Sequence, residues 1–324
     1  MLRRVTRPAA LASILISAIA CAVAAAEAPK VVVTVKPVHA LVAAVMAGVA
    51  EPTLVVDGSA SPHTFTLKPS VARAINSADI FIRVSEQLEP FTRKVAEALP
   101  GTVLLITLVD EKNGVKLLAQ RMNGTFERHA HAEDGDHDGH DDHDQDEHLS
   151  GAIDAHVWLD PANATAIVEN VTKALAAKYP AHAVTFNANA AALLAKIDAL
   201  TSEIEKDLAP VKGKPFIVFH DAYQYFEKRF GLAAAGSVTL SPDQQPSAKR
   251  LTQVRKKIGE LGAVCVFAEP GFQPNLINAV TEGTKARAGT LDPEGITLQP
   301  GPELYFELMR GLAKNAVACL GSSK

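Results

Sequence analysis

Histidine is the residue type in this chain whose placement points most directly to chemistry. Six of the eleven histidines lie between positions 129 and 148, interleaved with nine Asp or Glu residues. Imidazole nitrogen suits zinc, copper and nickel, and the carboxylates draw divalent cations by charge. The stretch has no apolar period, so we expect a solvated loop over residues 128–148. An acidic linker that happens to contain histidine is the alternative. We interpret the histidines of this loop as weak accessory metal ligands, namely His129, His131, His137, His140, His143 and His148.

A more specific site is expected where single polar residues follow apolar strands. His63 and His220 follow two predicted strands, and Asp292 follows a third. His156 stands in a loop just before a helix. In parallel α/β sheets, ligands lie outside the carboxyl ends of the strands. Three neutral imidazoles with a carboxylate or a water is ordinary zinc coordination, so we predict that these four residues form a zinc site.

Two acidic residues could accept a hydrogen bond from the ring nitrogen of a ligating histidine that does not bind the metal. A ligating imidazole needs an acceptor for its second ring nitrogen, and Glu269 or Asp221 could supply one. A lone histidine at the end of a strand is more often structural. No local spacing links the three histidines, so the fold must assemble the site.

The elements that must position these residues alternate between short apolar strands and helices. Four strands are expected before the histidine-rich loop and four after it. They are apolar on both faces, which is typical of parallel strands covered on two sides. We therefore predict an α/β fold of two (β/α)4 lobes with parallel sheets and a metal site in the cleft between them. The predicted strands are 31–35, 54–56, 78–84, 103–108, 215–219, 238–240, 263–268 and 286–291.

A long helix is expected to join the lobes. Asp160 is placed as the N-cap of a helix that begins at Pro161 and ends before Pro180. A second helix is predicted over residues 181–209, because its apolar residues keep a period of 3.6. At 1.5 Å per residue it spans about 40 Å, more than one domain needs, so we interpret it as a connector. A plain core helix is the alternative. The lobes are then expected at residues 27–180 and 210–324.

Residues 1–26 have the layout of a secretory signal peptide. Three Arg precede an apolar run, and small residues ending A-V-A-A-A precede Glu27. A membrane anchor is the alternative. Losing the three Arg of this leader takes the formal charge from −4 to −7. A mildly acidic protein has no electrostatic reason to bind nucleic acid, and it suits a cationic ligand.

Two cysteines remain after the leader, Cys265 and Cys319. In an exported protein, two cysteines are expected to form one disulfide. Here it would tie the C-terminal segment to a strand. Two buried free thiols are the alternative.

Five segments of the chain are similar to one known family. They read S-P-H-T-F-T-L-K-P-S, D-A-H-V-W-L-D-P, F-I-V-F-H-D-A-Y-Q-Y-F, V-F-A-E-P-G-F and G-T-L-D-P-E-G. Together they resemble the zinc-uptake (ZnuA-type) solute-binding proteins of bacterial ABC transporters, over nearly all of the mature chain. The resemblance implies two βα lobes joined by a long helix, with the metal held between them and delivered to a membrane permease.

Carried over residue by residue, the resemblance implies His63, His156 and His220 as ligands. Histidine at the third position favours zinc, since related manganese-binding members use a carboxylate there. Asp292 matches the fourth, carboxylate position, which water fills in some zinc members. Some zinc members carry Glu directly before the first ligand, where this chain has Pro62. The acidic histidine-rich insert and the cysteine pair are also similar to the zinc members.

The expected function is that of a periplasmic protein that captures Zn²⁺ and delivers it to an inner-membrane ABC permease with its ATPase, without catalysis. A periplasmic metallochaperone is a further expected partner, and we expect a monomer that binds no nucleic acid. A secreted zinc hydrolase is the alternative, because three histidines with one open position is also a catalytic arrangement. Glu269 is then the candidate general base. A metal buffer or adhesin that uses the same site is a third interpretation.

Overall fold

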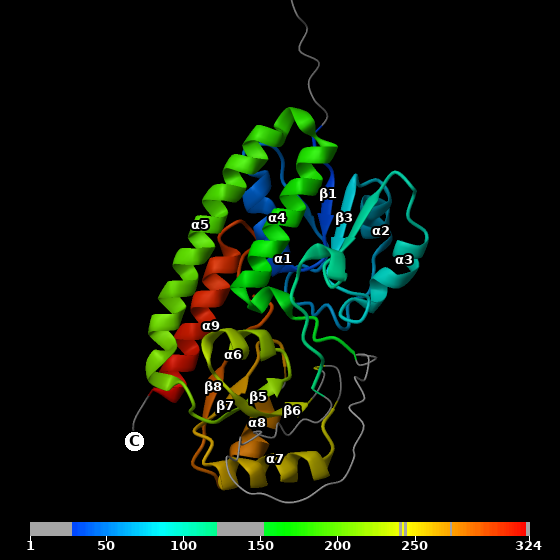
Figure 1. The fold of residues 1–324 in the computed structure, drawn as a ribbon. Coiled ribbons are helices and arrows are strands. Elements are labelled where there is room, and N and C mark those ends of the chain that lie inside the picture. Colours follow the sequence, from blue (N-terminus) through cyan, green and yellow to red (C-terminus); the bar gives the residue numbers. More distant parts are fainter. Residues whose placement is uncertain (1–27, 122–151, 240–241, 243–244, 273, 322–324) are drawn as a thin grey trace, which may run out of the picture.

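Two four-stranded parallel sheets form the frame of the molecule (Figure 1). The computed structural model describes residues 28–121, 152–239, 242, 245–272 and 274–321. The strand order is β2-β1-β3-β4 in the first sheet and β6-β5-β7-β8 in the second. The predicted α/β fold with two parallel-sheet lobes is therefore confirmed. The strands are β1 (Val31–Val33), β2 (Thr53–Leu54), β3 (Ile80–Arg83), β4 (Leu104–Thr107), β5 (Phe216–His220), β6 (Ala234–Thr239), β7 (Cys265–Ala268) and β8 (Arg287–Thr290).

Helices cover both faces of each sheet because the strands are apolar on both sides. In β1, Val31 and Val33 join one core cluster and Val32 joins another, so alternate side chains are buried on opposite faces. All five residues of β5 are buried as well. The covering helices are α1 (Lys36–Met46), α2 (Pro69–Asn76), α3 (Arg93–Glu97), α4 (Pro161–Lys178), α6 (Gln224–Phe230), α7 (Ala248–Leu261), α8 (Pro274–Thr281) and α9 (Leu304–Leu320).

The longest helix, α5 (Ala183–Leu208), runs along one side of the molecule next to α9 (Figure 1). It also packs against α1 and α4 of the first half. The predicted apolar period is confirmed, since its buried residues are Phe186, Ala190, Leu193, Ile197, Leu200, Ile204 and Leu208. Asp160 caps α4 as predicted, because its side chain accepts the N–H of Ala162.

The largest buried apolar cluster is continuous between the two halves. It contains Val33 of β1, Ile197 of α5 and Phe216 of β5. Two smaller clusters lie against the other faces of the two sheets. The lobes therefore share one core along α5 and α9.

The clearest departure from the predicted elements is β6. A short strand is predicted at 238–240, whereas the strand runs over Ala234–Thr239 and is buried at all six residues. Its sequence is A-A-G-S-V-T, and Ala and Gly are depleted in strands, so the pattern gives little signal there. Burial between β5 and the helix α7 sets the strand instead.

The C-terminal segment is tied to the second sheet by the predicted disulfide, which is confirmed. The Sγ atoms of Cys265 in β7 and Cys319 in α9 are bonded at 2.05 Å. The predicted leader at 1–26 and the predicted loop at 128–148 lie outside the described residues. Within the part of the chain that the structure describes, no helix is long and apolar enough to cross a membrane.

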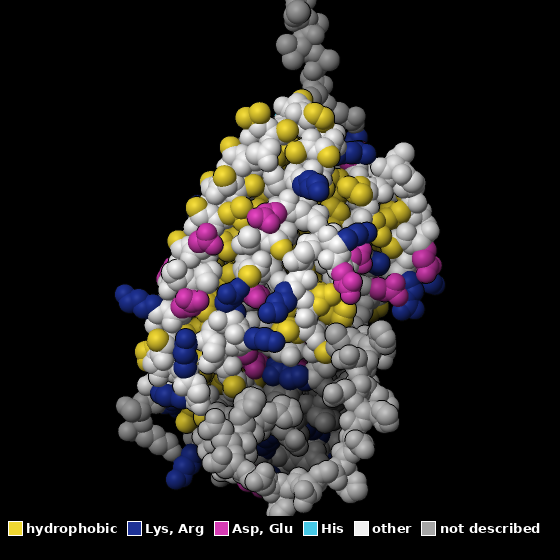
Figure 2. Space-filling model, in the orientation of Figure 1, with side chains coloured by type: hydrophobic (Ala, Val, Ile, Leu, Met, Phe, Trp, Pro, Cys, Tyr) yellow, Lys and Arg dark blue, Asp and Glu magenta, His cyan; other side chains and the backbone are white. Residues whose placement is uncertain are grey.

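Charges of both signs are spread over the face of the molecule shown in Figure 2. Figure 2 shows Lys and Arg side chains interspersed with Asp and Glu over the face that it presents. Among the described residues, the cluster of histidines lies inside the molecule, between the two sheets.

Candidate metal centre

Three histidines from separate segments meet between the two sheets. His63 lies in the loop after β2, His156 directly precedes the 3₁₀ helix Val157–Leu159, and His220 is the last residue of β5. Ring centroids are 5.8 Å apart for His63–His156 and for His63–His220, and 5.2 Å apart for His156–His220. One ligand nitrogen of each ring lies within 4.8 Å of the other two. A single ion can therefore contact all three imidazoles.

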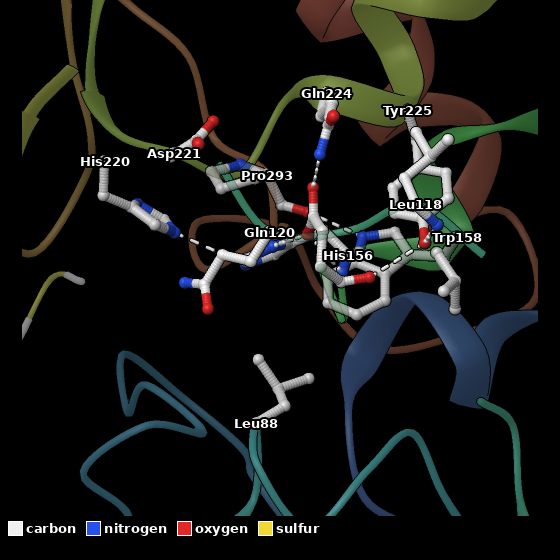
Figure 3. Close-up of polar contacts among 12 residues, drawn as sticks. Leu88, Leu118, Gln120, His156, Trp158, His220, Asp221, Gln224, Tyr225 and Pro293 are labelled. Atoms are coloured by element: carbon white, nitrogen blue, oxygen red, sulfur yellow. Dashed lines mark hydrogen bonds and ion pairs between the residues drawn. The ribbon is translucent and has the colours of Figure 1, made fainter. Parts of the chain in front are cut away.

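Carboxylates orient two of the rings. Nδ1 of His156 lies 2.8 Å from Oδ1 of Asp154, and Nδ1 of His220 lies 2.6 Å from Oε2 of Glu269. Because a carboxylate only accepts, Nδ1 of each neutral ring carries the proton and Nε2 carries the lone pair. The two Nε2 atoms face each other at 3.4 Å (Figure 3). Nitrogens about 2.05 Å from a tetrahedral zinc lie about 3.3 Å apart, so this pair has the spacing of two zinc ligands.

His63 completes the triangle. Its Nε2 is buried without a hydrogen-bond partner, and its side chain is 15% exposed. Burial, and then the neighbouring His220 and His156, lowers the pKa of His63 to about 2. The ring is therefore neutral at neutral pH and offers a lone pair to a cation.

Asp154 is a site residue that the sequence pattern does not single out. Its carboxylate accepts both the backbone N–H of His156 and the ring proton. The hydroxyl of Tyr225 donates to the Asp154 carbonyl, and the side-chain amide of Gln224 donates to the Asp154 carboxylate. Fully buried Trp158 packs its ring 5.4 Å from that of His156. The local signal is the acid two residues before the histidine in D-A-H.

The two acids that were expected to hydrogen-bond the histidines, Glu269 and Asp221, make different contacts. Glu269 is almost fully buried and holds the ring of His220. Asp221 faces Arg121, whose guanidinium also binds Glu227. Burial raises the pKa of Asp221 to about 6, against the opposing effect of Arg121. Asp221 thus forms part of an ion-pair cluster beside the site.

Asp292, the predicted fourth ligand, does not belong to the described group of ligand atoms that meet within 4.8 Å. Its carboxylate accepts the backbone N–H groups of Glu294, Ile296 and Thr297. Glu294, from the same turn, has Oε1 4.0 Å from Nε2 of His63. Burial, followed by the nearby carboxylates, raises the pKa of Glu294 well above its ordinary value. The turn after β8 therefore brings a different acid to the histidines.

The donor set determines which ions fit. Calcium and magnesium take oxygen ligands, whereas imidazole nitrogen suits zinc, copper and nickel. Three imidazoles whose ligand nitrogens lie within 4.8 Å of one another suit a single ion of zinc or another divalent transition metal.

Comparisons with known proteins agree with this chemistry. Residues 31–319 match the family model described as zinc-uptake complex component A, periplasmic. High-affinity zinc uptake system protein ZnuA of Brucella abortus is 44% identical over 311 residues, which cover 91% of this chain and 93% of that protein. The protein of the same name from Yersinia pestis is 35% identical over 309 residues, covering 90% and 91%.

A solved structure shares the fold. The Zn(II)-bound ZnuA-like domain of AdcA from Streptococcus pneumoniae superposes with a TM-score of 0.65 at 22% identity, covering 88% of this chain and 98% of that one.

Proposed function

This chain belongs to the zinc-uptake complex component A family, and from that premise we propose that it is the periplasmic zinc-binding component of a high-affinity ABC import system. It captures Zn²⁺ as cargo and delivers it to the membrane permease. The observation that carries this proposal is the meeting of His63, His156 and His220 within 4.8 Å, with two of their Nε2 atoms 3.4 Å apart.

Export to the periplasm and contact with a membrane transporter complete the proposed function. The leader at 1–26 is cleaved on export, and the mature chain acts as a monomer that meets a permease with its ATPase and a periplasmic metallochaperone. The segment 128–148 adds weak zinc sites to the specific one. Its histidine and acid content supports this role, because both residue types bind divalent metal ions.

Binding, rather than catalysis, is the activity that the geometry supports. A zinc hydrolase needs a general base beside the metal-bound water. Glu269, the candidate base, instead accepts from Nδ1 of His220 and from the hydroxyl of Tyr223 at 3.1 Å. Its carboxylate is thus engaged in holding the ring of His220, so the residue nominated as the base of a hydrolase already has another role.

Metal analysis tests the proposal. Purified mature protein, loaded with zinc and then washed with a weak chelator, should retain one Zn²⁺ per chain. The triple variant His63→Ala, His156→Ala, His220→Ala should retain none, whereas His182→Ala, outside the cluster, should retain one. One tightly held zinc in the triple variant would refute the assignment of the site.

Growth tests delivery. A strain that lacks the gene should fail in zinc-depleted medium. The wild-type gene should restore growth and the triple variant should not. Equal rescue by both would show that zinc import does not depend on this site.

A further inference from the structure

Arg121, from the segment after β4, binds two carboxylates of the second half of the chain. Its Nε and Nη2 atoms donate to Asp221, and its Nη1 and Nη2 atoms donate to Glu227. These hydrogen bonds are between 2.6 and 3.1 Å long. Arginine presents its N–H groups in a rigid fork, so a guanidinium bound in this way fixes the positions of both carboxylates.

The two carboxylates that Arg121 binds are almost fully buried. Asp221 is 4% exposed and Glu227 is 5% exposed. Among the described residues, Arg121 is the only cation that forms an ion pair with either of them. A buried charge is costly unless it is paired and hydrogen-bonded. Glu227 also accepts the N–H of Ala234 at the start of β6, so the ion pairs are anchored to the second sheet.

Asp221 connects these ion pairs to the metal site. It directly follows the ligand His220 in the chain, so a contact that holds its carboxylate also holds the end of β5. The negative charge of Asp154, which orients the ring of His156, repels that of Asp221. Arg121 attracts Asp221 and so offsets this repulsion. The ion pair thus favours the close approach of His156 and His220, whose Nε2 atoms are 3.4 Å apart.

Neutral hydrogen bonds hold the segment that carries Arg121. The N–H of Leu118 donates to the hydroxyl of Tyr225 at 2.9 Å, and the side-chain amide of Gln224 donates to the carbonyl of Ala119 at 3.0 Å. Tyr225 and Gln224 belong to α6, in the second half of the chain. Arg121 therefore extends from a backbone that α6 already holds, so that its guanidinium keeps a defined position.

We propose that Arg121 is a positioning residue of the zinc site, which keeps His220 opposite His156 by binding Asp221 and Glu227. The proposal rests on the zinc-binding function proposed above. Arg121 acts through the neighbour of a ligand rather than as a ligand, because a guanidinium has no lone pair to offer. Without it, the strand end that carries His220 is held less firmly, and zinc leaves the site faster.

Two variants, Arg121→Lys and Arg121→Gln, separate the charge from the geometry. Lysine keeps the positive charge but loses the fork, whereas glutamine loses both. Arg310→Gln is the matched control, because Arg310 forms a forked pair with Glu203 on the surface. Transfer of zinc from the loaded protein to a chelator should be about 10-fold faster in Arg121→Lys and up to about 100-fold faster in Arg121→Gln. The control should release zinc at the wild-type rate.

Two further measurements distinguish positioning from a contribution to folding alone. The visible spectrum of the Co²⁺-loaded protein reports the arrangement of the ligands, and it should change in both Arg121 variants. The unfolding temperature of the metal-free protein should fall in Arg121→Gln, because two buried carboxylates lose their cation. It should fall less in Arg121→Lys, which keeps a positive charge.

A wild-type rate of zinc release and a wild-type cobalt spectrum in Arg121→Gln would overturn the proposal. They would do so even if the unfolding temperature falls, since that combination describes a residue that only stabilises the fold. If Arg121→Gln does not fold, the same two measurements on Arg121→Lys decide, and wild-type values there overturn the proposal. Retention of tight zinc by the triple histidine variant would instead refute the proposed function, so the two failures are distinguishable.

Discussion

The nitrogen that faces away from the site governs how well each histidine binds metal. A ring whose Nδ1–H donates to a carboxylate is fixed in one tautomer and one orientation, and its Nε2 becomes a better ligand. His156 and His220 have such partners in Asp154 and Glu269. His63 is kept neutral by burial and by the other two rings. In the proposed site, zinc affinity therefore depends on Asp154 and Glu269 as well as on the three histidines.

Replacing Asp154 with Asn should weaken zinc binding without removing a ligand. The amide is a weaker acceptor for Nδ1–H of His156, and we expect a loss of about 10- to 100-fold in zinc affinity. Chelator competition measures it. Asp79→Asn is the matched control, because Asp79 accepts hydrogen bonds from Lys30 and Tyr179 away from the site. Equal zinc affinities for Asp154→Asn and wild type would contradict the orienting role.

The sequence indicates the three histidines but not all of their supporting residues. His63 and His220 follow apolar runs, and the carboxyl ends of parallel strands converge, so their meeting could be predicted. Glu294 could not be, because its position depends on a turn that Asp292 and Lys36 hold through long-range contacts. A pattern shows which residues end strands, but it does not show how a loop bends afterwards.

Among the elements, β7 and α9 are joined covalently as well as by packing. Cys265 and Cys319 close a loop of 54 residues. Gly289 of the neighbouring strand β8 lies so close that an added Cβ would be 2.7 Å from the ring of Phe267. The disulfide thus fastens α9 over a tightly packed part of the second sheet.

Removing this disulfide should lower the free energy of unfolding. For a loop of this length, chain entropy gives about 4 kcal/mol, within an observed range of roughly 2–5 kcal/mol. Urea unfolding of Cys265→Ser, Cys319→Ser against wild type measures the change. Wild-type protein in reducing buffer is the control and should shift in the same direction. An unchanged midpoint in the double variant would show that the cross-link contributes nothing to stability.

How well a strand can be predicted depends on the size of its apolar residues. Strands such as β1 and β3 are made of large apolar residues, and their burial on both faces is visible in the sequence. β6 is made of small residues, and its burial comes from its neighbours. Tertiary packing therefore decides a strand that local propensity leaves open.

For the molecule as a whole, the described residues on the two sides of the stretch 122–151 pair with each other. Ala119 pairs with Ile153, the N–H of Gln120 donates to Ala152, and the N–H of Asp154 donates to Leu118. This antiparallel stem lies directly before His156. It holds the two chain ends together irrespective of what the segment between them contains.

Deleting residues 128–148 should therefore leave the specific site intact. The stem stays closed, so we expect one tight zinc per chain and fewer weakly bound ions. Isothermal titration calorimetry separates the two classes. Loss of the tight class in the deletion variant would contradict the division between a specific site and an accessory segment.

The packing of the two lobes against each other is the feature that the sequence predicts least. The period of residues 181–209 predicts a long helix, but it does not specify which neighbours that helix has. Packing of α5 against α1, α4 and α9 at once is a property of the whole fold.

The packing of α5 also affects how zinc can be released from the site. A wide swing of the lobes would strip apolar residues of α5 from their neighbours, at about 1.5–3 kcal/mol for each large side chain exposed. The loop that carries His63 contributes only partly buried apolar side chains, such as Ala60 and Phe65, to a smaller cluster, so moving it alone exposes less apolar surface. Handover of zinc is therefore cheapest as stepwise ligand exchange, in which an acceptor takes the ion from one imidazole at a time while the frame stays closed.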